Sequence, residues 1–69
     1  MTKSEAFRNL LQSEELNTEV ELLKKELMEM IVNSDDDEKE VREAAYIRIK
    51  VINELMARFE SIAKDDEIK

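Results

Sequence analysis

The acidic cluster between Asn33 and Asp37 holds the residue types that could do the clearest chemistry, since three aspartates follow one another there. Carboxylate and amide oxygens are the ligands that Ca²⁺ and Mg²⁺ prefer in proteins. A calcium-binding EF-hand loop beginning at Asn33 would need glycine and glutamate where the chain has Glu38 and Ala44. The cluster therefore predicts a solvated loop, in which Ser34 or one of the next two aspartates caps the following helix, and no metal site.

Other catalytic chemistry has little support, because the chain contains no histidine, no cysteine and no glycine. It therefore lacks the commonest general base, a thiol nucleophile and a glycine-rich loop that could bind phosphate. A bundle that binds two metal ions through carboxylates would use a Glu-x-x-His motif, which the missing histidine rules out. We expect a protein that is not an enzyme and that needs no cofactor.

The only tyrosine, Tyr46, has basic residues around it at helical spacing. Arg42 and Lys50 lie one turn away on either side, and Lys39 lies on the same face two turns back. The simpler interpretation is that the ring lies over neighbouring aliphatic chains and makes some cation–π contact. The alternative is an aromatic anchor for an external protein partner, whose binding face would then be Lys39, Arg42, Tyr46 and Lys50.

The acidic charge balance limits the partners that the chain can bind. It has 18 acidic and 11 basic residues, a net charge of −7, and a pI of about 4.6. Proteins that bind nucleic acids or anionic membranes normally present a basic face, so neither partner is expected. No apolar run is long enough to span a membrane, and no segment near the start resembles a signal peptide. Together with the absence of cysteine, these features favour a cytoplasmic protein.

The element expected to position these residues is one long helix over Asp37–Lys64, a stretch without glycine or proline. Hydrophobic and charged residues each make up 42% of the chain, a balance typical of helical bundles. Three apolar rows run along this helix: Val41, Ala45, Ile52, Leu55, Phe59 and Ile62, with Arg48 among them; Ala45, Ile49, Ile52, Met56, Phe59 and Ala63; and Ala44, Ile47 and Val51. Together they cover roughly half of the circumference, so the helix needs neighbours on more than one side.

A short amphipathic helix is predicted over residues 4–12. Thr2 and Glu5 have the spacing of a capping box at its start. Its apolar residues are expected on one face: Ala6, Phe7, Leu10 and Leu11. The simpler interpretation is that this helix closes one end of a bundle, and the alternative is a docking or membrane-touching segment.

The first long helix is predicted over residues 13–33, and the loop over residues 33–37 follows it. Ser13 and Thr18 are both possible N-caps of this helix. The apolar phase changes between Leu11 and Leu16, which indicates a kink or a break near Ser13–Asn17. Residues 65–69 are expected to fray, because acidic residues at a helix C-terminus oppose the helix dipole.

The predicted fold is all-α, with residues 1–69 in a single domain whose two long helices form an antiparallel hairpin. A chain of this length buries too little surface to be very stable alone, and it has no cysteine or histidine for a disulfide or a zinc site. We therefore expect a homodimer in the form of an antiparallel four-helix bundle. Its predicted interface is Ala45, Arg48, Ile49, Ile52, Leu55, Met56, Phe59 and Ile62.

Arg48 is the charged residue that interrupts the first apolar row. The simpler expectation is that its aliphatic stem lies across the core while its guanidinium reaches a carboxylate such as Glu19 or Glu26. The alternative is a residue that fixes the register of the helices, like a single polar residue in a coiled-coil seam.

The sequence favours a small interaction module that pairs with itself and presents a surface to another protein. One alternative is an acidic inhibitor that imitates the charge pattern of DNA or RNA, although basic residues interrupt the acids. Another is a small subunit whose core is completed by a different protein. No motif in the chain points to a particular family.

Overall fold

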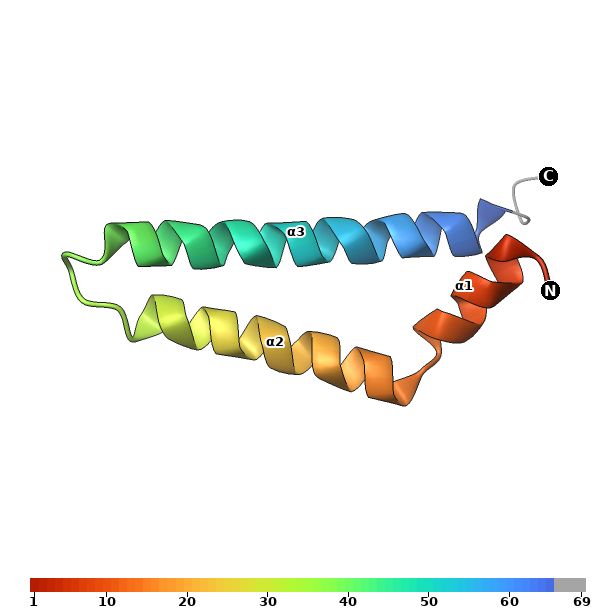
Figure 1. The fold of residues 1–69 in the computed structure, drawn as a ribbon, viewed down its shortest axis with the longest axis horizontal. Coiled ribbons are helices and arrows are strands. Elements are labelled where there is room, and N and C mark those ends of the chain that lie inside the picture. The colour runs from red at the N-terminus through yellow and green to blue at the C-terminus, as the bar shows by residue number, and fades with distance from the viewer. Residues whose placement is uncertain (66–69) are drawn as a thin grey trace.

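The computed structural model describes residues 1–65, which form three helices and no strand (Figure 1). They are α1 (Lys3–Leu11), α2 (Glu14–Val32) and α3 (Lys39–Ala63). The all-α class predicted from the sequence is confirmed for this part of the chain. The frayed tail expected over residues 65–69 lies, apart from Asp65, outside the described residues.

Side-chain caps fix the starts of α1 and α2. The Thr2 hydroxyl accepts a hydrogen bond from the Glu5 backbone N–H at 3.1 Å, which confirms the predicted cap of α1. The Ser13 hydroxyl accepts one from the Leu16 backbone N–H at 3.2 Å and caps α2 in the same way. Each cap satisfies a donor that the first helical turn leaves unpaired, and such a cap contributes about 1 kcal/mol.

The break between α1 and α2 falls at Gln12 and Ser13, at the edge of the region where the apolar phase shifts. Asn17 reaches back across it. Its side-chain amide donates hydrogen bonds to the backbone oxygens of Leu11 and Ser13, each at 2.9 Å. The Leu11 oxygen lies at the end of α1, where helical carbonyls lose their partners, so local bonds hold the corner between the two helices.

The loop between α2 and α3 differs from the expected one. The prediction that Ser34 or an aspartate caps the following helix is wrong, because α3 begins at Lys39 and its N-cap residue is Glu38. Glu38 makes no side-chain cap bond to α3. Its carboxylate instead accepts a hydrogen bond from the Asp35 backbone N–H at 2.9 Å, and its own N–H donates to the Asp35 oxygen at 2.9 Å. This closed turn delays the start of the helix.

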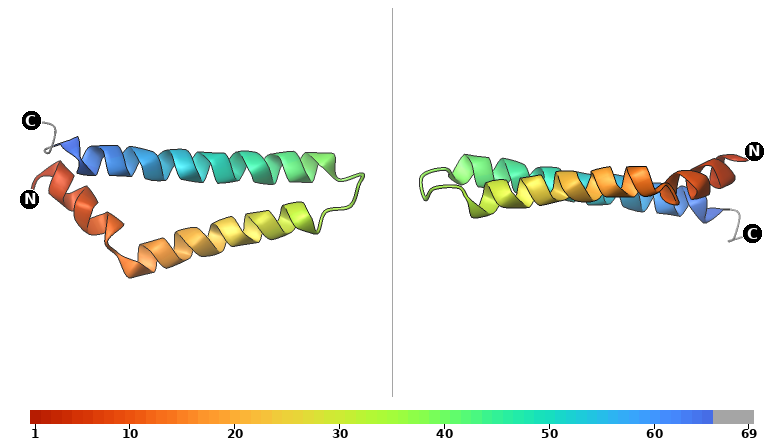
Figure 2. Two further views of the ribbon diagram at one scale, coloured as in Figure 1. Left: turned by 180° about the vertical axis from the view of Figure 1, so that it is seen from behind. Right: turned by 90° about the horizontal axis from the view of Figure 1, so that it is seen from below.

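The helices α2 and α3 lie side by side and run in opposite directions (Figures 1 and 2). They separate toward the end where α1 turns back from α2 and meets the C-terminal end of α3. Leu27 of α2 and Ala45 of α3 are buried. Lys24 Nζ donates to Asn53 Oδ1 at 3.2 Å and so connects α2 to α3 along one edge.

At the C-terminal end of α3, α1 contacts the helix through one aromatic and one polar interaction. The rings of Phe7 and Phe59 have their centroids 5.2 Å apart at an angle of 49°, a favourable tilted arrangement. Arg8 Nη1 donates to the backbone oxygen of Ala63 at 2.7 Å. A guanidinium at this place satisfies a terminal carbonyl and interacts favourably with the negative end of the helix dipole.

The inward face of α1 differs from the apolar face expected from the sequence. Ala6 and Leu10 are exposed, whereas Ser4 is buried and Phe7 and Arg8 are partly buried. Of the expected apolar face, Phe7 and Leu11 are thus partly covered, and Arg8 lies on the inward side because its guanidinium binds the end of α3.

The three helices form a single layer. The Cα atoms extend over 51 × 22 × 12 Å, so the molecule is thin in its third direction. Figure 2 shows this layer from its edge, where the helices overlap in a narrow band. Globular domains normally pack at least two layers around a shared core. Both broad faces of this layer are therefore open, and only contacts within the layer are made by the chain itself.

Candidate interaction face

One broad face of the layer carries a row of exposed apolar side chains, which we call the apolar face. Its members are between 43% and 59% exposed: Leu23 and Met30 from α2, and Ile47, Val51 and Leu55 from α3. A single exposed leucine is ordinary on a protein surface, but a contiguous apolar patch marks an interaction site.

The apolar face is continuous across the two helices. A shallow groove of about 310 Å³ lies over their junction, and residues of both helices line it: Leu23, Leu27, Ile47, Arg48, Val51 and Ile52. Met30 follows Leu23 by seven residues and Leu55 follows Val51 by four, so helical periodicity places each of them on the side of the groove.

The eight residues of the predicted interface fall into two groups in the structure. Those turned toward α1 and α2 are buried or partly buried within the chain: Ala45, Ile49, Ile52, Met56, Phe59 and Ile62. Leu55 and Arg48 are exposed: Leu55 belongs to the apolar face, and Arg48 lies beside it. The sequence prediction did not include Ile47 and Val51, although their row is visible in the apolar spacing of the helix.

No protein-family model, curated protein or solved structure matches this chain.

Arg48 lies in the groove of the apolar face with its side chain exposed. Within residues 1–65 it forms no ion pair, so the expected contact of its guanidinium with Glu19 or Glu26 is not made inside the chain. The row containing Ala45 and Ile52 faces α2. Arg48 lies at the side of this row, so its aliphatic stem does not cross the core as expected.

The basic face predicted around Tyr46 lies on the opposite side of α3 from Val51. Tyr46 is 56% exposed. Lys50 Nζ lies 5.4 Å from the centroid of its ring, which is the cation–π contact expected from the sequence. Lys39 Nζ lies 3.8 Å from a carboxylate oxygen of Glu43, and both side chains are well exposed.

Arg42, the fourth residue of that face, is engaged by the loop. Its Nη1 donates to the Ser34 hydroxyl at 3.1 Å and to the Asp35 backbone oxygen at 2.6 Å, and its Nη2 donates to the Asp36 oxygen at 3.3 Å. The planar guanidinium suits such a set of acceptors. Arg42 therefore connects the first turns of α3 to the loop, a contact that spacing along the sequence does not reveal.

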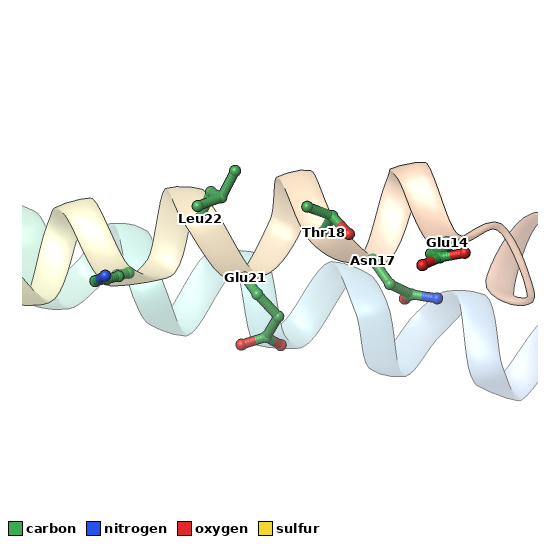
Figure 3. Close-up of a pocket in the computed structure, with 6 residues that line it drawn as sticks. Glu14, Asn17, Thr18, Glu21 and Leu22 are labelled. Carbon is green, nitrogen blue, oxygen red and sulfur yellow. The ribbon is translucent and has the colours of Figure 1, made fainter.

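Another hollow, of about 600 Å³, is lined by six residues that all belong to α2 (Figure 3), and it is not suited to a small ligand. A hollow along one helix has no opposing wall, whereas ligand sites enclose most of a ligand's surface. Within residues 1–65, no three acidic side chains lie together in a way that could hold a metal ion. In the same part of the chain, no helix is both long and apolar enough to cross a membrane.

Proposed function

We propose that this protein is a non-enzymatic helical interaction module whose primary partner is a second copy of itself. In this proposal α2 and α3 act as an antiparallel hairpin. Two hairpins stack through their apolar faces and form an antiparallel four-helix bundle. The resulting dimer would present a rigid helical surface to other proteins.

The observation that supports this proposal is the single layer of helices with exposed apolar residues on one broad face. Fully burying a valine, leucine or isoleucine side chain contributes about 1.5–3 kcal/mol. The residues of the apolar face are only half covered, so a second layer would gain part of that stabilisation at every one of them. Small domains commonly obtain the missing stability by association.

The size of the layer is sufficient for such an interface. A specific protein–protein interface buries about 800 Å² on each partner. The described chain has an accessible surface of 5662 Å², and its layer extends over 51 Å by 22 Å. A face-to-face contact over the α2–α3 part of one side can therefore reach the size of a stable dimer interface.

The mass in solution tests the proposal. Sedimentation equilibrium or light scattering at about 10–100 μM should give twice the chain mass of 8.1 kDa. The thermal midpoint should rise with protein concentration, because association and folding are linked. A well-folded 8.1 kDa monomer across this range would refute self-association.

The same open face could instead receive a different protein that completes the core. That alternative predicts a chain that is monomeric or poorly folded alone and that gains stability with a co-purified partner. An acidic imitation of a nucleic acid is less well supported, because bases lie among the acids of α2. For example, Lys24 Nζ lies 3.4 Å from Glu21 Oε1 and also donates a hydrogen bond to Asn53 Oδ1.

A further inference from the structure

Opposite charges lie on the two sides of the apolar face. On α2, Glu26 lies between Leu23 and Met30, at spacings of three and four residues, so all three share one side of the helix. On α3, Arg48 lines the groove beside Val51. Glu26 and Arg48 are both exposed. Beside the groove, the face is therefore acidic on α2 and basic on α3, whereas nearer the loop Glu40, seven residues before Ile47, adds an acid on the α3 side.

A second acid and a second base repeat this pattern nearer the α1 end. Glu19 precedes Leu23 by four residues on α2, and Arg58 follows Leu55 by three residues on α3, so both lie on the side of the apolar face. Both are exposed. Within residues 1–65, neither these two residues nor Arg48 and Glu26 form an ion pair in their own chain.

The acids and the bases also lie at matching levels along the molecule. The groove extends from Leu23 to Leu27 on α2 and includes Arg48 on α3, so Glu26 and Arg48 lie at the same level to within about one helical turn. From there toward α1, Arg58 lies ten residues further along α3, about 15 Å away, and Glu19 lies seven residues back along α2, about 10 Å away. The two charge patterns therefore stay in step to within one helical turn.

Two copies can stack through their apolar faces in two ways, which differ in the direction of the two-fold axis. An axis along the helices places each α3 over the α2 of the other copy. An axis across the helices places α3 over α3 and α2 over α2. The second arrangement brings bases over bases and acids over acids, which weakens association, whereas the first brings opposite charges together.

We infer that the homodimer has its two-fold axis along the helices, with Arg48 of each protomer facing Glu26 of the partner subunit. This inference rests on the proposed self-association. Rotation about such an axis does not change the position of a residue along the helix direction. Arg48 and Glu26 have similar positions along this direction within one chain, so Arg48 also has a similar position to Glu26 of the partner subunit. By symmetry the pair occurs twice, and Arg58 approaches Glu19 of the partner subunit in the same way.

Mixing two single variants tests this geometry. Arg48→Glu alone places two carboxylates together at both symmetric positions, and Glu26→Arg alone places two cations together. Each homodimer should dissociate with a Kd higher than that of the wild type on the order of tenfold. A one-to-one mixture should form a heterodimer with a Kd within about threefold of the wild type, because both cross-chain pairs are then of opposite charge.

The outcomes separate the inference from the proposed function. If the single variants associate as tightly as the wild type or more tightly, α3 does not lie over the partner's α2. The inferred direction of the two-fold axis is then wrong, and the proposed homodimer is retained. If mixing gives no heterodimer preference, the pair is not made between chains and the inference also fails. A wild type that stays monomeric overturns the proposed homodimer itself.

A matched pair of variants controls for net charge. Lys50→Glu changes the charge of α3 as much as Arg48→Glu does, but Lys50 lies beside Tyr46, away from the apolar face. Glu29→Arg similarly matches Glu26→Arg on α2, where Glu29 lies with Met28 and Val32 on another side of the helix. These two variants should each dimerise as the wild type does and should show no preference for one another. A heterodimer preference as strong as that of the test pair would show that bulk charge, and not the inferred pair, drives the effect.

Discussion

Two apolar rows of α3 are covered to different extents. The row that faces the neighbouring helices is buried at Ala45, beside α2, and at the C-terminal end, where Ala63 is buried and Phe59 stacks on Phe7 of α1. The row beside it leaves Ile47 and Val51 more than half exposed. The same helix thus has one covered row and one open row.

The single layer explains this difference. α1 has nine residues and α3 has 25, which correspond to about 13 Å and about 37 Å of helix. It meets α3 where α2 has separated from it, so it replaces α2 within the layer and covers neither broad face (Figure 1). An added layer would therefore stabilise most over the middle of the open row.

The largest effect is expected from a charge placed in the open middle. Val51→Glu would put a carboxylate at the centre of the proposed dimer contact, where burial without a partner costs several kcal/mol. We expect the dimer Kd to rise by at least about 100-fold, and light scattering should show the 8.1 kDa monomer at concentrations where the wild type is paired.

Tyr46→Glu provides the matched control for that variant. Tyr46 is 56% exposed and Val51 is 55% exposed, so the two positions on α3 differ in side and not in accessibility. Tyr46→Glu should leave the mass of the protein unchanged. Equal loss of dimer in both variants would mean that a carboxylate anywhere on α3 is disruptive, and the apolar face would lose its special role.

A smaller effect, on stability alone, is expected at the covered end. Phe59→Ala removes the ring that stacks on Phe7. Phe→Ala changes in full cores cost about 3–5 kcal/mol, and since both rings are partly exposed we expect about 2 kcal/mol. Urea denaturation should detect this loss, while the dimer mass at high concentration should persist.

Leu10→Ala serves as the comparison for the covered end, because Leu10 lies on α1 but is 40% exposed. It should cost less than half as much as Phe59→Ala. If Phe59→Ala instead abolished the dimer while the monomer stayed folded, the contact between copies would have to extend to the α1 end.

A still smaller effect is expected at the loop. Arg42→Ala removes the donors to the Ser34 hydroxyl and to two loop carbonyls. These bonds are partly exposed to solvent, so we expect a loss of about 1 kcal/mol in the free energy of unfolding and faster amide hydrogen exchange over residues 33–38. Arg42→Lys should restore only part of it, because an ammonium cannot match the planar fork. Full rescue by lysine would show that charge alone matters here.

Local features of the fold were predictable from the sequence, and long-range ones were not. Thr2 caps α1 through a bond to a residue three positions away, so spacing alone predicts it. Spacing left Ser13 and Thr18 both open as caps of the next helix, and the structure has Ser13 as the cap and Thr18 inside α2. The start of α3 depends on a turn closed by Glu38 and on the reach of Arg42 back to the loop. Neither contact has a sequence signature, and the expected cap was therefore wrong.

The candidate site shows the same limit. Periodicity displays three apolar rows on α3 but does not say which one packs against α2 within the chain. The structure turns the row of Ala45 inward and leaves Ile47 and Val51 exposed, so the predicted interface mixes covered residues with exposed ones. Arg48 was expected to reach a carboxylate such as Glu19 or Glu26, and only the packing of α2 on α3 decides whether that contact is made within the chain.

The smallest effect on folding and pairing is expected at Tyr46, which makes this residue the sharpest test of an external partner. Its ring makes one exposed cation–π contact with Lys50, worth about 0.5–1 kcal/mol at most. Tyr46→Ala should therefore shift the free energy of unfolding by less than about 1 kcal/mol and leave the dimer Kd unchanged.

Because dimerisation would cover the apolar face and leave this side of α3 open, Tyr46 and Lys50 would remain accessible to another protein. A pull-down from the native host that loses a partner with Tyr46→Ala, at unchanged helicity and mass, would support a second binding face there. The same partners recovered with both proteins would leave the apolar face as the working surface of the molecule.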